Sequence, residues 1–197
     1  MTAPVPTALP YGMRDIKLTP YDDASGIDLG AASEDLPYAR TLSFSEAEDF
    51  EELKGDDRTI SMRGKGATVE FEIESGGISL VAWSIMSGGE ILESGTTPNR
   101  VITLRKRGQN ARPWFRAEGQ AISDSGGDIH CILYRCRVTD TLEGEMNEGE
   151  FFLTAAKGNA LPLLDDIDDV LYDFVQNETA VAIPLTPVAN PVTPEDP

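Results

Sequence analysis

The sequence predicts a mainly β protein, an antiparallel β-sandwich or barrel with one flanking α-helix. Its clearest strand is residues 69–74, where large apolar side chains alternate with Glu70, Glu72 and Glu74. Successive side chains of a strand point to opposite faces, so one face of this strand is apolar and the other acidic. Extended segments recur along the chain roughly 8 to 12 residues apart with glycine-rich turns between them, a spacing typical of sandwiches and barrels.

The flanking helix is predicted directly after this strand. Ser75-Gly76-Gly77 interrupts the strand, and apolar residues then recur with helical spacing from Ile78 to Met86. Trp83 widens the apolar stripe, so we expect the helix to be covered on more than one side. Ser87-Gly88-Gly89 ends it, because glycine readily adopts the left-handed conformation that follows a helix.

The other elements follow from local patterns. Residues 46–53 leave two alternatives open, a short helix or a continuation of the preceding strand. Residues 160–173 are expected to lead into a short closing helix or strand. Extended segments are expected at residues 12–19, 36–45, 58–63, 90–93, 101–106, 114–123, 129–142 and 150–155, the longest of them being 129–142.

Proline marks both ends of the chain and sets the expected domain limits. Residues 1–10 are predicted to form a flexible arm and residues 11–180 a single domain. Residues 181–197 are predicted to form a flexible, proline-rich tail, because such a composition does not build a core.

The charge balance excludes several classes of partner. The net charge is -18, from 34 acidic and 16 basic residues, so we expect no non-specific binding of nucleic acid. No apolar run reaches the ~18 to 20 residues that span a bilayer, so we expect no membrane insertion. Residues 1–10 lack the basic start and apolar core of a signal peptide.

The two cysteines are predicted to be unbonded. Cys131 and Cys136 are an odd number of residues apart, which places them on opposite faces if the segment is one regular strand. We interpret both as buried or half-buried free thiols.

No motif predicts catalysis, a metal or a cofactor. The turn at residues 124–127 resembles the nucleophile turn of trypsin-like proteases, but the only histidine, His130, follows Ser125 and no base precedes it. We interpret this turn as a hairpin connection. One histidine and two cysteines on opposite faces do not make a zinc site. The aspartates within residues 165–169 lack the pattern of a calcium loop and are interpreted as a solvated edge.

A basic island interrupts the acidic sequence between residues 100 and 116. A contact with protein, a solvated hairpin and a nucleic-acid patch are the three interpretations. In so acidic a chain we favour the first, with the acidic segment 46–57 of a neighbouring copy as the partner. The island contains Arg100, Arg105, Lys106, Arg107, Arg112 and Arg116, with Trp114 and Phe115 among them.

Several collinear segments carry a resemblance to a known family. They are Ala39–Ser45, Glu48–Leu53, Gly55–Asp57, Gly76–Leu80, Ser94–Pro98, Glu118–Asp128 and Leu171–Ala180. In these the chain resembles the major tail tube proteins of long-tailed bacteriophages (siphophages), especially those that infect actinobacteria. The resemblance extends from about Leu9 to Pro184 and leaves the remaining tail outside.

The resemblance implies a structural protein of the virion, not an enzyme, without a cofactor. Members of this family form homohexameric rings that stack helically into a hollow tail tube. Each subunit is a β-sandwich of the tail-tube type with one flanking helix and a long inter-ring loop, and four strands per subunit line the channel. DNA passes through this channel during ejection without specific binding. The other implied partners are the tape-measure, tail-tip and terminator proteins, and the implied location is the virion tail, assembled in the host cytoplasm.

Within this scheme we expect Glu70, Glu72 and Glu74 to line the channel, because a negative wall repels phosphate and lets DNA slide. The alternatives are that this face lies on the outer surface or pairs with Arg135 and Arg137 across the sheet.

The loop at residues 46–66 is the candidate ring-to-ring contact, with an ordinary exposed hairpin as its alternative. A competing function is a monomeric β-sandwich binding or decoration module of a virion or cell surface, which predicts no self-assembly. The candidate contact residues are Glu46, Glu48, Asp49, Glu51, Glu52, Asp56, Asp57, Arg58, Arg105, Lys106 and Arg107.

Overall fold

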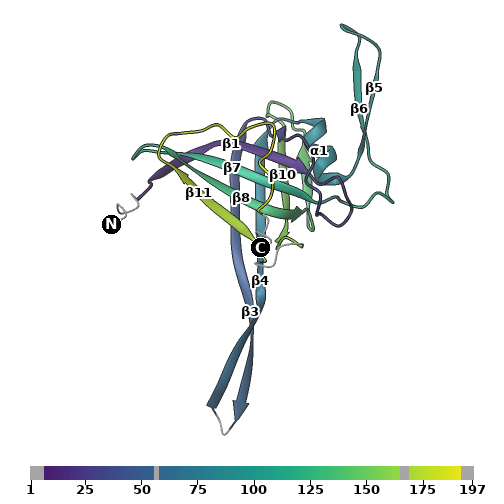
Figure 1. The fold of residues 1–197 in the computed structure, drawn as a ribbon. Coiled ribbons are helices and arrows are strands. Elements are labelled where there is room, and N and C mark those ends of the chain that lie inside the picture. The colour runs from purple at the N-terminus through teal and green to yellow at the C-terminus, as the bar shows by residue number, and fades with distance from the viewer. Residues whose placement is uncertain (1–6, 56–57, 165–168, 192–197) are drawn as a thin grey trace, which may run out of the picture.

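The computed structural model describes residues 7–55, 58–164 and 169–191, which confirm a mainly β protein (Figure 1). It contains one large antiparallel sheet of nine strands, a separate two-stranded hairpin and one short helix. The elements are β1 (Pro10–Pro20), β2 (Glu34–Asp35), β3 (Ala39–Gly55), β4 (Arg58–Gly76), α1 (Leu80–Ser87), β5 (Glu90–Ser94), β6 (Val101–Arg105), β7 (Phe115–Ser123), β8 (Asp128–Arg137), β9 (Leu142–Glu145), β10 (Leu153–Leu161) and β11 (Tyr172–Asn177).

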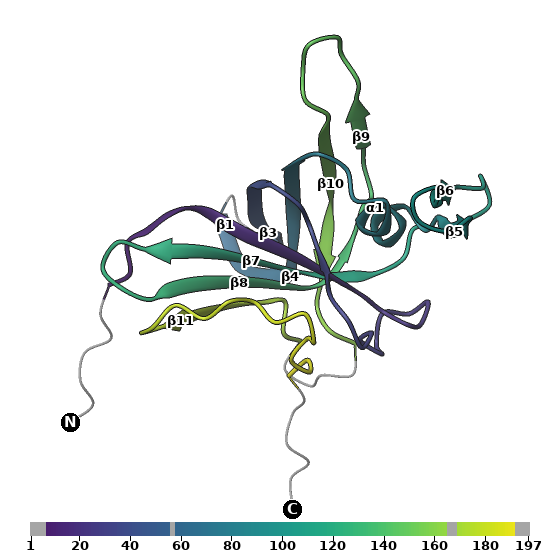
Figure 2. The same cartoon turned by 90° about the horizontal axis from the view of Figure 1, so that it is seen from above.

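The large sheet has the strand order β2-β1-β7-β8-β10-β4-β3, with β11 paired to β8 and β9 paired to β10. It divides into two layers whose strands are paired with each other only where three residues of β8 pair with β10. We name them the β7 layer (β2, β1, β7, β8, β11) and the β4 layer (β9, β10, β4, β3). Figures 1 and 2 show the strands of the β7 layer running across those of the β4 layer.

The hydrophobic core lies between the two layers. Phe71 of β4 meets Phe115 of β7 edge to face, with 5.9 Å between ring centroids. Gly119 of β7 lets Leu42 of β3 approach closely, since a Cβ at Gly119 would lie 2.5 Å from the Leu42 Cδ2 atom. The predicted alternation of β4 is confirmed by burial: its apolar side chains point into the core and the intervening glutamates point away. Fully buried core residues include Ile16, Leu18, Val69, Ala82, Met86, Ala117, Leu133, Cys136 and Ala160.

The predicted helix is confirmed as α1, although it begins at Leu80, two residues later than the apolar spacing indicated. Ser79 sets this start, because its side chain caps the helix by accepting from the Ala82 N–H. Gly88, with φ of 77°, ends the helix and donates its N–H to the Ser84 carbonyl. Trp83 is partly buried and donates its indole N–H to Thr154 on β10.

Residues 46–53 continue β3 as a strand, which resolves the alternative in favour of the strand. The described residues of the candidate ring-to-ring loop, 46–55 and 58–66, belong to a hairpin of β3 and β4, which we call the arm; it projects from the body of the molecule (Figure 1). Consequently β3 and β4, with 17 and 19 residues, are the longest strands. The register of the pairing in the arm shifts between Glu48 and Phe50 and between Leu53 and Lys54. The prediction of one long strand over residues 129–142 was wrong, because the chain leaves β8 after Arg137 and starts β9 at Leu142.

The cysteines are both free, as predicted, but the prediction of opposite faces was wrong. Phe115 pairs with Cys136 and Ala117 pairs with Leu133, so β8 contains one residue more than β7 between these positions. This bulge reverses the alternation, and Cys131 and Cys136 both face the core.

Three further features shape the surface. The β5–β6 hairpin stands away from the body (Figure 1), and the β9–β10 hairpin carries Met146 and Phe151 beyond its strands, 83% and 93% exposed.

Residues 178–191, which we call the C-terminal segment, form no helix or strand. The segment includes part of the expected flexible tail, and it contacts the β7 layer; residues 192–197 lie outside the described part. Among the described residues, no helix has the length and apolar character needed to cross a membrane.

Candidate functional site

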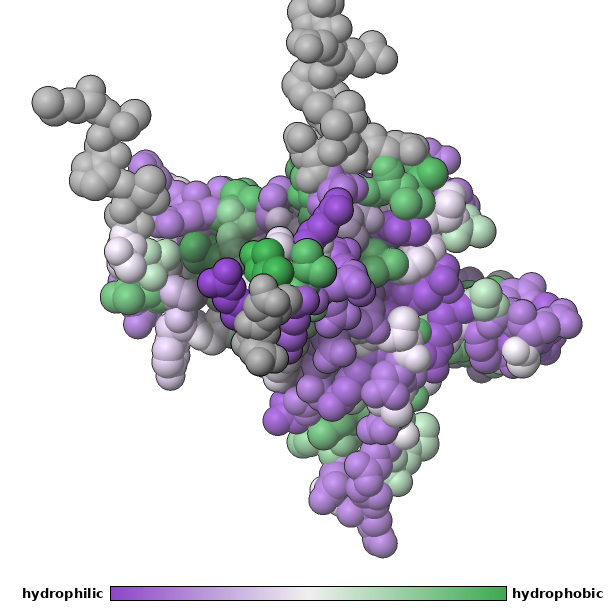
Figure 3. All heavy atoms as spheres, turned by 90° about the horizontal axis from the view of Figure 1, so that it is seen from below, coloured by the Kyte–Doolittle hydropathy of each residue, from purple (hydrophilic) through white to green (hydrophobic). Residues whose placement is uncertain are grey.

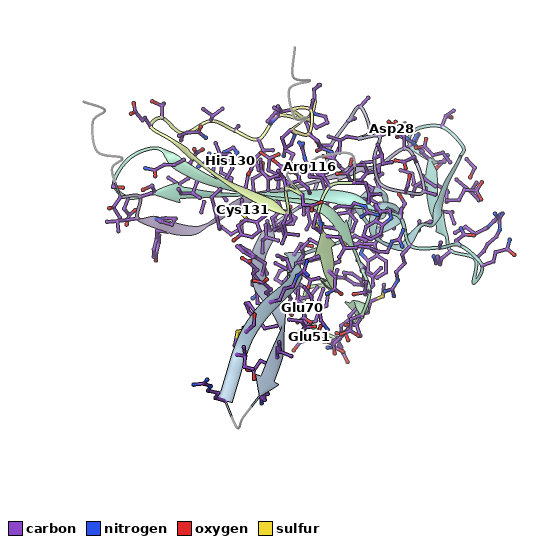
Figure 4. All side chains as sticks on the ribbon, turned by 60° about the horizontal axis from the view of Figure 1, so that its bottom comes forward. Asp28, Glu51, Glu70, Arg116, His130 and Cys131 are labelled. Atoms are coloured by element: carbon purple, nitrogen blue, oxygen red, sulfur yellow. The ribbon has the colours of Figure 1, made fainter. Side chains whose placement is uncertain are left out.

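The face of the β4 layer that points away from the core is polar and acidic. Glu70, Glu72 and Glu74 lie along its central strand, β4. Directly paired residues share a face, so Glu143 of β9 lies on this face beside Ala155, the partner of Glu74. Glu145 follows two residues later on the same side. We call this surface the acidic face; Figure 4 shows Glu70 on it.

Two ion pairs reduce the charge of the acidic face. Lys157 of β10 lies 3.1 Å from Glu72, and Arg40 lies 3.1 Å from Glu74. In the described part of the chain only two of these five glutamates form ion pairs, so the row of glutamates keeps a net negative charge. Arg135 and Arg137, the alternative partners of this face, instead stack on Trp114 at 4.3 and 3.7 Å from the ring centroid to the guanidinium carbons.

The third component of the acidic face was not foreseen from the sequence. Thr41, Ser43 and Ser45 of β3 pair with Glu74, Glu72 and Glu70 respectively, which places a row of small hydroxyl side chains beside the carboxylates. The signal was present as alternation of hydroxyl and apolar residues in segment 39–45. A shallow pocket of about 350 Å³ lies between this row and β10, lined by polar groups such as Asn159.

The arm carries the predicted contact residues on a two-stranded hairpin. Its acids are partly paired within the hairpin, since Lys54 contacts Glu52 and Lys65 contacts Glu51. Asp56 and Asp57, two of the predicted contact residues, lie outside the described residues. Figure 3 views the molecule from the side toward which the arm points and shows hydrophilic residues with apolar patches between them. Large apolar side chains that are exposed on the arm are Phe50, Leu53, Ile60 and Met62.

The structure disperses the predicted basic island. On the β5–β6 hairpin, Arg100 pairs with Glu93 and Arg107 pairs with Glu90. Arg105 is exposed and lies opposite Glu90 in the strand register.

The rest of the island is used inside the subunit. Lys106 donates to the carbonyls of Ser87 and Asn110 and so closes the C-terminal end of α1. Arg112 donates to the Val138 and Asp140 carbonyls. Arg116 is buried in the β7 layer.

A cluster of buried polar side chains lies on the side of the β7 layer away from the core (Figure 4). The sequence patterns did not predict it. Every second residue of β7 contributes to it, and the facing positions of β8 complete it. We call it the polar cluster. Its members are Arg116, Glu118, Gln120, Asp128 and His130, none more than 8% exposed.

Each side chain of the polar cluster has a partner of suitable charge or hydrogen-bonding type, although the buried Arg116 Nε atom makes no hydrogen bond within the described part of the chain. Arg116 contacts the Glu118 carboxylate at 3.5 Å. His130 places Nδ1 3.1 Å from Glu118 and Nε2 3.2 Å from Asp128 and 3.0 Å from the Val181 carbonyl oxygen. Burying charges is costly without partners, so these contacts explain how the charges are tolerated.

Asp128 is the most connected member of the cluster. Its carboxylate accepts from the side chains of Asn177 and Gln120 and from the Val181 N–H. Burial by itself raises the pKa of this carboxyl group, but the hydrogen bonds from Asn177, Gln120, Val181 and His130 together lower it to about 2.

The residues considered for catalysis are not assembled into a site. The Ser125 hydroxyl bonds with Ser123 and the Thr7 carbonyl, whereas His130 bonds within the polar cluster. Among the described residues, no group of three or more metal-ligating side chains could hold a metal ion. The aspartates at 165–168 lie outside the described part of the chain.

Comparison with known proteins gives no match to a family model or to a curated protein. The functional argument below therefore stands on the residues and their arrangement.

Proposed function

We propose that this protein is a subunit of a phage tail tube, a β-sandwich of the tail-tube type that forms hexameric rings stacked around a DNA channel. The observation that carries the proposal is the β4 layer: four strands with a polar, net negative outer face and a free edge on either side. The hexameric number, the location in the virion tail and the tape-measure, tail-tip and terminator partners come from the family resemblance alone. We propose neither a catalytic role nor a cofactor.

The free edges of the β4 layer support assembly through strands. No described strand pairs with the outer edge of β3 or of β9. Unpaired edges expose backbone donors and acceptors that another strand can satisfy. If β9 of one copy pairs with β3 of the next, a head-to-tail contact arises, and such contacts generate a ring when the rotation between copies closes. The part of β3 from Thr41 to Ser45 has hydroxyl side chains and no acidic ones, so Glu143 and Glu145 of a neighbouring β9 would meet no like charge there.

The acidic face supports the channel role. A ring closed in this way would direct Glu70, Glu72 and Glu74 toward its axis. Negative charge on a narrow wall repels phosphate and lowers the affinity for DNA, while small hydroxyl side chains leave the wall smooth.

The two projecting hairpins support axial stacking. The arm and the β5–β6 hairpin project from opposite ends of the molecule in Figure 1. Residues 46–57 contain seven acidic side chains and one lysine, whereas residues 90–107 contain four basic and two acidic side chains. Although Arg100 and Arg107 are paired within the β5–β6 hairpin, this region keeps a net positive charge, which would attract the acidic arm of the next ring. The exposed apolar side chains of the arm would be buried between them.

The experiment is electron microscopy of the purified protein over a range of concentration and salt, together with its mass in solution. Stacked rings with a central channel are expected. The variant Arg105→Glu with Arg107→Glu should fold and form rings that stack poorly, whereas Arg14→Glu, an exposed cation outside both hairpins, should stack normally. A chain that stays monomeric even with tail-tip components added would favour the alternative, a monomeric binding or decoration module.

A further inference from the structure

The C-terminal segment is held against the β7 layer almost entirely through its main chain. Val181 donates its N–H to Asp128, and its carbonyl accepts from Gln120 at 2.9 Å. The Val188 carbonyl accepts from Arg116 at 2.6 Å. The Leu185 carbonyl accepts from the Ser33 N–H at 2.7 Å.

Side chains of the segment contribute little to this contact. Ile183 alone is deeply buried, with 4% of its surface exposed. Val181, Leu185 and Val188 remain largely exposed. Asn190 adds a polar side-chain contact, since its amide bonds both Arg116 and the Tyr21 hydroxyl.

The receptor for this main chain is the polar cluster. Arg116, Gln120, Asp128 and His130 all bond the segment or its flanks. Removing the segment would take away four hydrogen bonds of these buried side chains and leave them only their contacts within the cluster. The cluster is therefore suited to a peptide cover, and it selects backbone atoms and not particular side chains.

The cover is also incomplete. A cavity of about 490 Å³ lies between the segment and the outer side of β8 and β11. Its lining includes Ile132, Tyr134, Val175 and Pro184. This pocket is partly open to solvent, so the segment does not pack tightly over the apolar side chains beneath it and rests more on its hydrogen bonds.

We propose that the groove formed by the polar cluster is a receptor for an extended peptide, and that it accepts residues 178–191 of a second copy of this chain in exchange for its own. Identical segments make identical contacts, so exchange between copies costs little. Residues 178–180 are exposed and connect β11 to the segment, where the exchange would need only a change of chain direction.

Concentration decides which segment occupies the groove. A short tether gives the chain's own segment an effective concentration of about millimolar, so dilute copies keep their own. Copies packed side by side present a neighbour's segment at comparable concentration, and the two then compete. This inference does not depend on the proposed tail tube.

The first test uses a fluorescent peptide of residues 178–191 and the full-length chain carrying Val181→Pro. Proline lacks the N–H that bonds Asp128, so this chain holds its own segment less tightly. Fluorescence anisotropy should show that the natural peptide binds this variant chain at least about tenfold more tightly than a peptide carrying Val181→Pro. The proline peptide lacks the hydrogen bond to the charged Asp128 carboxylate. The unmodified chain should bind the natural peptide more weakly than the variant does. Equal binding of the two peptides, or none at about millimolar peptide, overturns the proposal.

The second test leaves the groove's charged residues intact and traps exchange between whole chains. One tagged copy carries Ser33→Cys and a differently tagged copy carries Leu185→Cys, residues joined by a backbone hydrogen bond within one chain. A short bis-maleimide should link the two copies with a yield that rises with concentration. Tyr38→Cys, at an exposed position, replaces Ser33→Cys as the collision control. A yield no higher than this control at the highest concentration contradicts exchange.

Discussion

Replacement of Asp128 by asparagine should destabilise the folded protein substantially. The carboxylate accepts hydrogen bonds from four groups, and asparagine would turn an NH₂ group toward some of these donors. The depressed pKa gives one measure of the stabilisation: a fall from the ordinary 3.8 to about 2 corresponds to roughly 2 kcal/mol in favour of the folded state. The NH₂ group of asparagine would also face some of these donors, which adds to the loss. We therefore expect Asp128→Asn to lower the free energy of unfolding by about 2 to 4 kcal/mol.

The assay is thermal unfolding followed by circular dichroism at pH 7. For a domain of this size each kcal/mol shifts Tm by about 2 to 4 °C, so the variant should melt roughly 5 to 15 °C below the unmodified protein. Asp124→Asn, in the exposed turn of the same hairpin, is the matched control and should change stability by no more than about 0.5 kcal/mol.

The pH dependence provides the sharper test. A carboxyl group whose folded-state pKa is lowered stabilises the fold above its ordinary pKa, and this contribution is lost as the pH falls toward the folded value of about 2. The difference in stability between the unmodified protein and Asp128→Asn should therefore narrow from pH 5 downward. Equal Tm values at pH 7, or a difference that stays constant down to pH 2, would refute the role assigned to the carboxylate.

Three further outcomes follow from the core, the helix cap and the thiols. Phe71→Ala should cost about 3 to 5 kcal/mol in guanidinium titrations, because Phe71 fills the space between the layers; a loss below about 1 kcal/mol would contradict that packing. Ser79→Ala should cost about 1 kcal/mol by removing the helix cap, and an unchanged midpoint would argue against the cap. Burial raises the pKa of Cys131 to about 12 and that of Cys136 further, so Ellman's reagent at pH 8 should label neither in the native state and both in guanidinium; rapid native labelling would place the thiols outside the core.

The parts of the fold that the sequence predicts are those with strong local periodicity. The alternation of residues 69–74 predicted both faces of β4, and the change of period after Gly77 predicted α1. These signals depend on neighbouring residues alone. The same alternation places Glu70, Glu72 and Glu74 in one row opposite the apolar face, which is where the fold has them.

The parts that were missed depend on contacts between distant segments. The sequence left residues 46–53 open between helix and strand, and only their pairing with the strand predicted at residues 58–63 makes this region a long hairpin of β3 and β4. Arg116 belongs to the basic island in the sequence, but in the fold it is buried and donates to Val188, which lies 72 residues later in the C-terminal segment. The prediction that Cys131 and Cys136 face opposite sides of the sheet was wrong because β8 has one extra residue opposite β7. Nothing in the local sequence indicates this bulge.

The charge along the free edge of β3 also affects which contacts between two copies of the chain are unfavourable. Five of the seven residues from Glu46 to Glu52 are acidic, whereas the part of β3 from Thr41 to Ser45 is neutral. Two copies that met symmetrically through the far part of β3 would bring rows of carboxylates together, and like charges facing each other across strands are destabilising. This repulsion disfavours symmetric pairing of two β3 edges and edge-to-edge aggregation of sheets. Head-to-tail contacts avoid this repulsion, so the charge pattern of β3 favours assemblies that have a direction over symmetric ones.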